Sequence, residues 1–307
     1  MRAVVIQEFG GPEVLRSIET PVPSPGAGEV LVKVGASPVN PIDIGARVGA
    51  FAAFLPPREY YVPGIEFAGT VAELGAGVTD STLGDPVIGL IPWLADPVGS
   101  YADYVVVPAD VLASAPRGVD LVAAATLPLN GITADAAVRA ADAQAGHTVL
   151  VTGAAGGVGG YAVQLAAASG ARVIAVAGAG DADLVRSLGA TDFIARDESL
   201  AERLREVRID AVIDAALLGP SLITVVRDGG RFIALLPPVA PESERDITVS
   251  TVQQAPDGRR LAELVELVEA GRLTLRVAET YPLAEAAAAH ARFEKGGVRG
   301  RLVLLPN

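Results

Sequence analysis

The stretch from His147 to Gly170, HTVLVTGAAGGVGGYAVQLAAASG, constrains the fold more than any other part of this 307-residue chain. An apolar run over 148–152 predicts a strand, and apolar residues at helical spacing follow it up to Gly170, a residue type that suits a helix end. Because the first amides of a helix have no internal partner, a glycine turn between the two forms an anion site that a pyrophosphate can approach closely. We therefore predict dinucleotide binding; the alternative is a tight strand-to-helix turn without a ligand. The expected contacts are Gly153, Gly156, Gly157, Val158 and Gly159.

The composition excludes several classes of partner and site. A net charge of −12 argues against nucleic acid and anionic membranes, since both bind basic surfaces. The chain has no Cys, which excludes disulfides, thiol nucleophiles and thiolate metal ligands. The first ten residues read as a strand and a turn rather than a signal peptide, and no apolar run approaches the ~20 residues of a membrane span. These features predict a cytoplasmic protein without membrane or nucleic-acid partners.

The sequence pattern changes about one third of the way along the chain. Up to about residue 115, short apolar runs are separated by Gly and Pro, as in a barrel-like β domain. From 121 onward, strands and helices alternate, which predicts an α/β domain with a doubly wound parallel sheet. Its expected elements are strands at 148–152, 171–177, 192–195, 209–215 and 230–236, and helices at 121–126, 131–143, 157–168, 181–188, 198–206 and 219–226.

The end of the chain is expected to return to the β-rich part, because the doubly wound sheet is by then complete. A helix over 257–270 precedes a strand near 275–280, a helix over 283–294 and a strand at 301–305. The predicted domains are therefore 1–120 with 271–307, and 121–270. The cleft between two such domains is the expected ligand site.

Motifs spread along the chain carry a resemblance to a known family. They are VNPID at 39–43, VPGIEFAGTV at 62–71, GSYADYVVVPAD at 99–110, ATLPLNGITA at 125–134, the glycine turn, and KGGVRGRLVL at 295–304. With these motifs the chain resembles the zinc-independent quinone oxidoreductase branch of the medium-chain dehydrogenase/reductase superfamily. The resemblance implies a GroES-like catalytic domain and a Rossmann domain, with NAD(P)H between them. It also implies hydride transfer to quinones or other conjugated carbonyl compounds, and a homodimer.

The residue types at the zinc positions of this superfamily predict a metal-free site. Zinc-dependent relatives carry Cys where this chain has Asn40, and a His-Glu pair where it has Ile65 and Glu66. The only histidines are His147 and His290, each expected to be a core or boundary residue, so no tetrahedral site can be assembled from them without Cys. Without a Lewis acid, alcohol oxidation is disfavoured, whereas hydride transfer to an electron-poor acceptor needs no metal.

Three residues are candidates for the catalytic site. The amide of Asn40 could hydrogen-bond a substrate carbonyl or the nicotinamide ribose, or Asn40 could simply be a turn residue before proline. Asp43 could orient Asn40, relay a proton or cap a helix. Tyr60 belongs to an aromatic concentration with Phe51, Phe54 and Tyr61, which could stack on a flat quinone or pack in a core or dimer contact. Glu66 is expected to be structural, and Trp93 to line the same cleft.

The remaining candidates concern the cofactor. Thr126 and Thr133 match a segment beneath the nicotinamide ribose in the family, although hydroxyl residues also cap helices. The strand at 171–177 is followed by Gly178 rather than an acid that would bind the ribose 2′-hydroxyl, which favours NADPH over NADH. The usual basic residue near position 180 is also missing; Arg186 could reach the 2′-phosphate or lie on a solvated helix face. Asp214, Leu235, Leu236, Pro237 and Arg301 match segments that contact the nicotinamide half in relatives.

The leading hypothesis is thus an NADPH-dependent quinone reductase, with a small-molecule quinone or enone as its partner. One alternative is a reductase of enone or enoyl C=C bonds in a biosynthetic pathway. Another, of a different class, is a non-catalytic NADPH-binding protein with a structural or sensing role.

Overall fold

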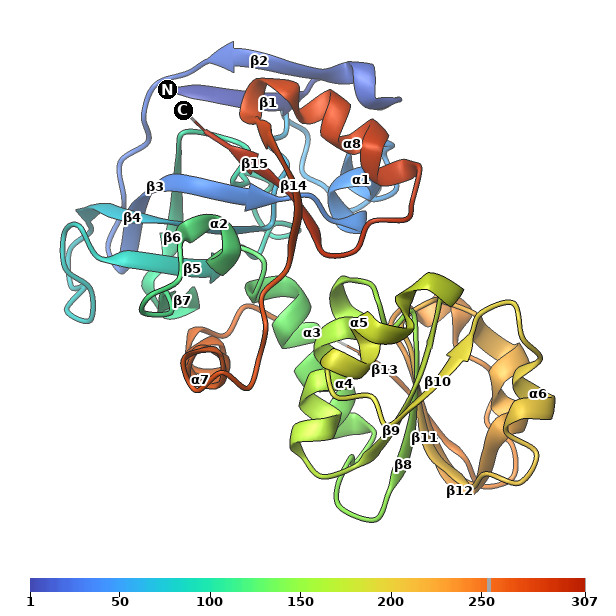
Figure 1. Cartoon of the computed structure of the whole chain (residues 1–307). Coiled ribbons are helices and arrows are strands. Elements are labelled where there is room, and N and C mark those ends of the chain that lie inside the picture. The colour runs from blue at the N-terminus through green and yellow to red at the C-terminus, as the bar shows by residue number, and fades with distance from the viewer. Residues whose placement is uncertain (253–254, 307) are drawn as a thin grey trace. The chain divides into compact units, whose positions relative to one another are not determined.

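The computed structural model describes residues 1–252 and 255–306, which form two compact units. Unit 1 comprises Met1–Leu129, Ala255–Glu269 and Leu275–Asn307, and unit 2 comprises Asn130–Gln254 and Ala270–Thr274. This division differs from the expected one at two helices, α2 (Leu121–Ala124) and α7 (Gly258–Glu269), which belong to unit 1. The reason is packing: α2 lies on strands β3 (Glu29–Pro38) and β4 (Glu66–Leu74), and α7 lies on strand β7 (Leu112–Ser114) (Figure 1).

Unit 1 is built mainly on antiparallel strands, as the short apolar runs indicate, although its strands β14 and β15, whose bounds follow, pair in parallel. Its larger sheet has the order β14-β15-β3-β4-β5-β7, with β6 also paired to β3, and β1 and β2 form a separate two-stranded sheet. The strands are β1 (Arg2–Ile6), β2 (Leu15–Glu19), β3 (Glu29–Pro38), β4 (Glu66–Leu74), β5 (Pro86–Leu90), β6 (Tyr104–Pro108), β7 (Leu112–Ser114), β14 (Val277–Pro282) and β15 (Arg301–Leu305). The expected return of the last strand is confirmed, because Val303 pairs with Pro38 and Leu304 with Ser37.

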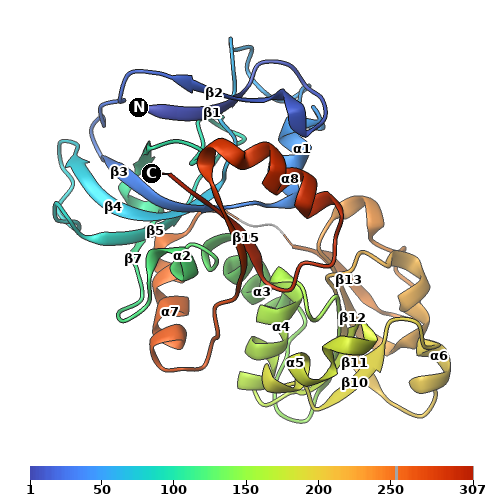
Figure 2. The same ribbon diagram turned by 45° about the horizontal axis from the view of Figure 1, so that its top comes forward.

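Two helices of unit 1 position its polar residues. Helix α1 (Pro41–Arg47) starts directly after β3 with Pro41 in its first turn, where a missing N–H costs nothing. Helix α8 (Ala286–Glu294) follows the 3₁₀ turn η6 (Leu283–Glu285) and packs against the turn η1 (Pro12–Val14) and strand β15 (Figure 2). A further 3₁₀ turn, η2 (Ala109–Val111), links β6 to β7.

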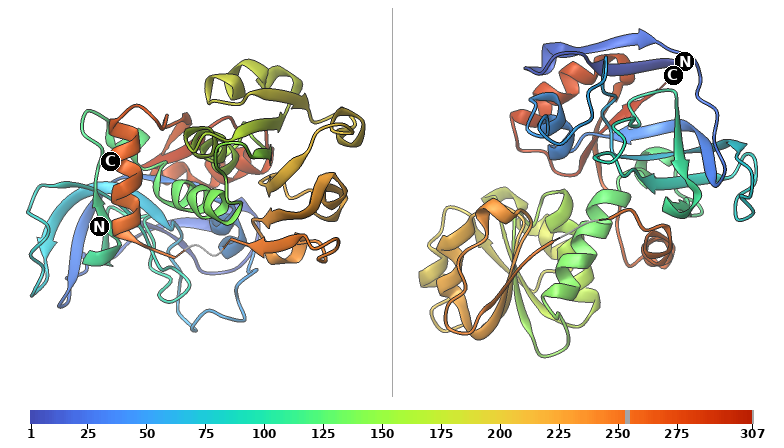
Figure 3. Two further views of the ribbon diagram at one scale, coloured as in Figure 1. Left: turned by 90° about the horizontal axis from the view of Figure 1, so that it is seen from below. Right: turned by 180° about the vertical axis from the view of Figure 1, so that it is seen from behind.

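Unit 2 confirms the predicted doubly wound parallel sheet, with the strand order β10-β9-β8-β11-β12-β13. The strands are β8 (Thr148–Thr152), β9 (Arg172–Ala177), β10 (Asp192–Ala195), β11 (Ile209–Asp214), β12 (Val226–Ala234) and β13 (Thr248–Thr251). The helices are α3 (Pro128–Ala140), α4 (Gly157–Ala168), α5 (Ala182–Ser187) and α6 (Leu200–Arg203), with 3₁₀ turns η3 (Ala179–Asp181), η4 (Gly219–Val225) and η5 (Pro237–Val239). Helices α4 and α5 cover one face of the sheet, and α6 and η4 cover the other (Figure 3).

The core of unit 2 lies between the sheet and its helices. Leu150, Val212 and Phe232 are completely buried there on three neighbouring strands. The expected helix at 219–226 is a 3₁₀ turn instead, and β12 begins at Val226 rather than at 230. Within 1–252 and 255–306, no helix is long and apolar enough to cross a membrane.

Candidate active site and cofactor-binding edge

The carboxylate of Glu66, at the start of β4, is the centre of a buried polar network in unit 1. Its Oε1 accepts hydrogen bonds from Asn40 Nδ2 (2.9 Å) and from Arg301 Nη2 (3.0 Å). Its Oε2 accepts the backbone N–H of Leu129 (2.7 Å) in the first turn of α3, where a negative charge is favourable. Glu66 is fully buried and Arg301 is 6% exposed, so the guanidinium balances the carboxylate charge inside the protein. The expectation of a structural Glu66 agrees with these contacts.

Asn40 and Arg301, both predicted at the site, are held to each other as well as to Glu66. Arg301 Nη2 also donates to Asn40 Oδ1 and to Val39 O (2.8 Å). The second contact of Asn40 Nδ2 is Pro38 O (3.4 Å). Every polar atom of the Asn40 side-chain amide thus has a protein partner. A hydrogen bond between this amide and a substrate would require the release of one of these partners. Within the described ranges, the buried Nε of Arg301 has no partner.

Asp43 joins this region through the backbone. As the third residue of α1, it accepts the N–H of Asn40 (2.8 Å) at the start of the helix, and its other oxygen accepts the N–H of Gly64 (3.0 Å). These contacts correspond to the capping alternative for Asp43. Burial raises the pKa of Asp43 to about 7, and the nearby Glu66 carboxylate adds to the shift, although the two backbone hydrogen bonds and Arg301 oppose it. Burial also raises the pKa of Glu66, against the opposing effect of Arg301.

A second buried cluster contains residues that sequence reasoning missed. The hydroxyl of Tyr101 lies 3.0 Å from His290 Nε2 on α8, and both side chains are fully buried. Burial lowers the pKa of His290 to about 3, and the guanidinium of Arg47 adds to this shift. Arg47, at the end of α1, is itself 1% exposed and donates to Gly10 O (3.1 Å) and Glu294 Oε1 (2.5 Å). The core position expected for His290 is confirmed, whereas no sequence signal marks Arg47 as buried.

Among the described residues, the side-chain hydrogen bonds of Asn40 and Asp43 do not include Tyr60. Its hydroxyl lies 3.5 Å from that of Thr20, which follows β2. The other aromatic residues are also dispersed: Tyr61 stacks on Phe9 with ring centroids 6.1 Å apart, and Phe54 is 79% exposed. Trp93 is buried and donates its indole N–H to Val62 O (2.6 Å). Proximity in sequence did not produce one aromatic surface, because these residues lie on loops that face different neighbours.

The glycine turn of unit 2 packs its backbone closely, in a way that depends on glycine. Gly153 has a φ of +60°, a conformation that favours glycine, and a Cβ placed on Gly159 would lie 2.2 Å from Gly153 O. Gly156 is the N-cap of α4, with no side-chain cap, and its added Cβ would contact only Gly153 O (3.1 Å). The first amides of α4 have no partner within the helix, and Gly156 and Gly157 at its start carry no side chains, which fits a dinucleotide.

The other cofactor candidates of unit 2 follow the same edge of the sheet as this turn. Gly178 follows β9, Asp214 ends β11, and Leu235, Leu236 and Pro237 follow β12. In a doubly wound sheet the carboxyl ends of the strands form the ligand-binding edge. Asp214 is fully buried and shapes this edge, accepting hydrogen bonds from Thr152 Oγ1 (2.7 Å) and from the N–H groups of Leu218 (3.1 Å) and Gly219 (2.8 Å).

Arg196, an arginine that sequence reasoning did not select, lies beside Gly178 at the end of β9. Arg186 is on the exposed face of α5, 3.6 Å from the carboxylate of Asp183, which corresponds to the solvated-face alternative. Arg196 follows β10, and its Nη2 lies 2.9 Å from the point where a Cβ on Gly178 would be. The carboxylate of Asp181 lies 2.9 Å from the same point. Sequence reasoning missed Arg196, although the pairing of β10 with β9 places the ends of both strands together.

The two threonines of ATLPLNGITA are in different units. The hydroxyl of Thr126 donates to Ala123 O (2.8 Å), one turn back in the chain, which is the helix-capping alternative. Thr133 is buried on α3. As for metals, the part of the chain that the structure describes contains no group of three or more His, Cys, Asp and Glu side chains that could hold an ion.

A GroES-like unit combined with a Rossmann-type sheet and its glycine turn defines the class of two-domain oxidoreductases that use a dinucleotide. Comparison with known proteins agrees. The family model "Alcohol dehydrogenase GroES-like domain" matches residues 26–117, and "Zinc-binding dehydrogenase" matches residues 188–304. The NADPH-dependent alkenal/one oxidoreductase of Arabidopsis thaliana is 33% identical over all of this chain and 80% of its own length.

Two solved structures resemble the whole chain. The quinone oxidoreductase from Coxiella burnetii has a TM-score of 0.90 and is 30% identical, with 100% of this chain and 99% of that chain covered. An NAD-dependent alcohol dehydrogenase has a TM-score of 0.91 and is 31% identical, with both chains covered completely. The chain therefore belongs to the quinone oxidoreductase branch of the medium-chain dehydrogenase/reductase superfamily, and it is an enzyme of that branch. Coenzyme and acceptor differ among these similar proteins, so they must be argued from this chain's own residues.

Proposed function

We propose that the protein is an NADPH-dependent, metal-free reductase that transfers a hydride to quinones or related conjugated carbonyl acceptors. The observation that carries the proposal is the saturation of Glu66 by Asn40, Arg301 and the Leu129 amide. This carboxylate is neutralised by a guanidinium and backbone, so it has no need of a metal ion to balance its charge. An acceptor already activated by conjugation is the kind of substrate that such a site can reduce.

The chain's own residues define how the cofactor would be held. Gly153, Gly156 and the first turn of α4 would bind the pyrophosphate, and Arg196 would bind the ribose 2′-phosphate of NADPH. When bound, the reduced nicotinamide supplies the hydride. The loop after β11, ordered by Asp214, and residues 235–237 would shape the nicotinamide end of the same edge.

The network around Glu66 would act by positioning. The side chain of Asn40 is held by Arg301 and Glu66. The carboxylate of Asp43 holds the backbone N–H of Asn40 at the start of α1. Burial raises the pKa of Asp43 to about 7, so this carboxyl group changes its protonation near neutral pH. We place Asn40 and Asp43 at the catalytic site as positioning residues, and we leave Tyr60 outside it.

Steady-state turnover tests this proposal directly. We expect anaerobic oxidation of NADPH with 9,10-phenanthrenequinone, and slower oxidation of NADH. Dialysis against EDTA should leave kcat/KM unchanged, because no step depends on a Lewis acid. Loss of activity on chelation, restored by zinc, would contradict the metal-free mechanism.

The name of the Arabidopsis relative, an alkenal/one oxidoreductase, favours a second candidate, the reduction of C=C bonds in enones. The product separates the two reactions: methyl vinyl ketone would yield the saturated ketone 2-butanone, whereas a quinone would yield a hydroquinone or semiquinone. NADPH binding without turnover of either acceptor class would favour a structural or sensing role. We also propose that the protein is a homodimer, which sedimentation equilibrium would measure.

A further inference from the structure

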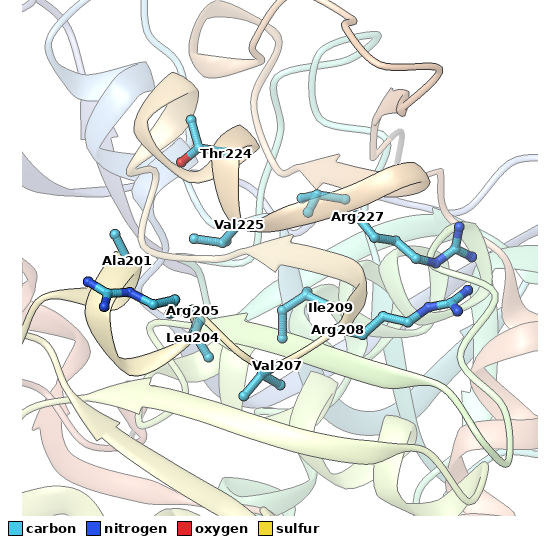
Figure 4. A pocket seen from close by; sticks show the side chains of 10 residues that line it. Ala201, Leu204, Arg205, Val207, Arg208, Ile209, Thr224, Val225 and Arg227 are labelled. Carbon is cyan, nitrogen blue, oxygen red and sulfur yellow. The ribbon is translucent and has the colours of Figure 1, made fainter.

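A pocket of about 330 Å³ lies in unit 2 between helix α6, the start of β11 and the start of β12 (Figure 4). Residues from these elements line it, among them Leu204, Ile209 and Val226. The parallel register pairs Thr152 with Asp214 at the carboxyl end of β11. The glycine turn follows that end, whereas Ile209 and Val226 begin their strands. The pocket is therefore at the amino edge of the sheet, opposite the cofactor-binding edge.

The pocket combines an aliphatic lining with arginine side chains. Its accessible apolar surface comes from Val207 and Val225, which are partly exposed, whereas Leu204, Ile209 and Val226 are at most 5% exposed and belong to the core of unit 2. Its ionisable lining residues are Arg205, Arg208 and Arg227. Figure 4 shows Arg205 beside Ala201 at one end, and Arg208 and Arg227 together at the other, with Val225 and Ile209 between them. Such a concentration of positive charge is unusual in a chain with a net charge of −12.

The arginines are only partly neutralised by neighbouring acids. Asp210 Oδ1 lies 2.6 Å from Arg227 Nε and 3.5 Å from Arg208 Nε, so one carboxylate serves two guanidinium groups. Its other oxygen accepts the N–H of Thr148 (2.9 Å). Arg205 makes no ion pair or side-chain hydrogen bond with the residues that the structure describes. The pocket thus has an excess of positive charge beside an apolar surface.

We propose that this pocket is a second ligand site, for a small amphipathic carboxylate with an aliphatic body. The carboxylate would bind Arg205, and the body would cover Val207 and Val225. The pocket volume is at the lower end of the range of small-molecule sites, which suits a medium-chain acid. Because the site lies at the opposite edge of the sheet, its ligand and NADPH would bind together rather than compete.

Octanoate is a suitable probe, and its binding can be measured by isothermal titration calorimetry and by the rise in Tm of the full chain. We expect saturable binding, and much weaker binding of 1-octanol, which lacks the charge, and of acetate, which lacks the body. Saturation with NADPH should leave the octanoate Kd unchanged. Displacement of octanoate by NADPH would overturn the proposal, because it would place the acid at the cofactor edge.

Single substitutions assign the binding to this pocket. Arg205→Gln should weaken octanoate binding roughly tenfold, as expected for the loss of a charge-assisted hydrogen bond. The matched control is Arg203→Gln: Arg203 lies two residues earlier, is paired with Glu198 and does not line the pocket. Both side chains are exposed, so both variants should keep the Tm of the unliganded protein. Equal affinity in the two variants, or no saturable binding to the unaltered protein, would refute the site.

Discussion

At the scale of single residues, Glu66 and Arg301 illustrate a charge pair that depends on both partners. Replacing Glu66 by Gln leaves the buried Arg301 without a balancing charge, since the guanidinium is only 6% exposed. We expect Glu66→Gln to lower the free energy of unfolding by about 3–5 kcal/mol, measured by urea denaturation. The control Glu198→Gln, which removes an exposed pair with Arg203, should leave the free energy of unfolding nearly unchanged. Similar small losses in both variants would show that the buried pair is dispensable.

Coenzyme preference is also decided by single residues. Arg196→Ala should raise KM for NADPH roughly tenfold or more, because a charge-assisted contact to the 2′-phosphate is lost. KM for NADH should be nearly unchanged, since NADH carries no 2′-phosphate. The matched control is Arg186→Ala, which alters an exposed arginine paired with Asp183 on α5. A larger effect of the Arg186 substitution than of the Arg196 substitution would contradict the assignment.

At the scale of elements, the junction of β8 and α4 depends on glycine for close backbone packing. A methyl group on Gly159 would lie 2.2 Å from Gly153 O, so Gly159→Ala must displace the first turn of α4. We expect this variant to lose NADPH affinity by more than tenfold, as measured by fluorescence titration. Gly180→Ala is the control, because an added Cβ there meets no atom within 4 Å, and it should bind NADPH normally. Unchanged affinity in Gly159→Ala would show that the turn does not hold the pyrophosphate.

The elements that sequence patterns identified were those with strong local signals. Strand β8 and helix α4 have the expected bounds, because an apolar run, a glycine turn and a helix-ending residue mark them. Strands β2 and β13 and helix α1 were not expected. Strand β2 contains several exposed polar residues, so it has no continuous apolar run that would mark it as a strand. Strand β13 is only four residues long. Helix α1 is only seven residues long, and its start depends on the contact between Asp43 and the Asn40 N–H.

At the scale of the whole molecule, two buried groups link stability to pH with opposite signs. Asp43 has a pKa of about 7 in the folded protein against a usual 3.8, so the folded state holds more protons between these values. Its contribution to stability therefore falls as pH rises from about 4 to 7. His290 has a pKa of about 3 against a usual 6.5, so its contribution falls as pH drops below 6.5. Each slope is at most about 1.4 kcal/mol per pH unit, and the two oppose each other between about 4 and 6.5.

Asp43→Asn should expose this balance. The variant lacks the contribution of Asp43, which lowers the free energy of unfolding as pH rises. The free energy of unfolding of the variant should therefore rise more steeply with pH than that of the unaltered protein. Urea denaturation at pH 5, 6, 7 and 8 measures this: the difference between the two proteins should change up to about pH 7 and then become constant. Parallel stability curves at all four values would mean that Asp43 does not titrate in this range.

The sequence by itself determined the fold class, the parallel sheet, the position of the glycine turn and the family, because each has a local pattern of residue types. It also placed Asn40, Asp43 and Arg301 among the candidate residues of the site. Only the tertiary structure decided what these side chains contact: Arg301 arrives from the last strand, 235 residues after Glu66. The tertiary structure likewise placed Arg196 beside Gly178 and the hydroxyl of Tyr60 beside that of Thr20. The physical reason is that burial and charge pairing arise between distant segments, which no spacing along the chain encodes.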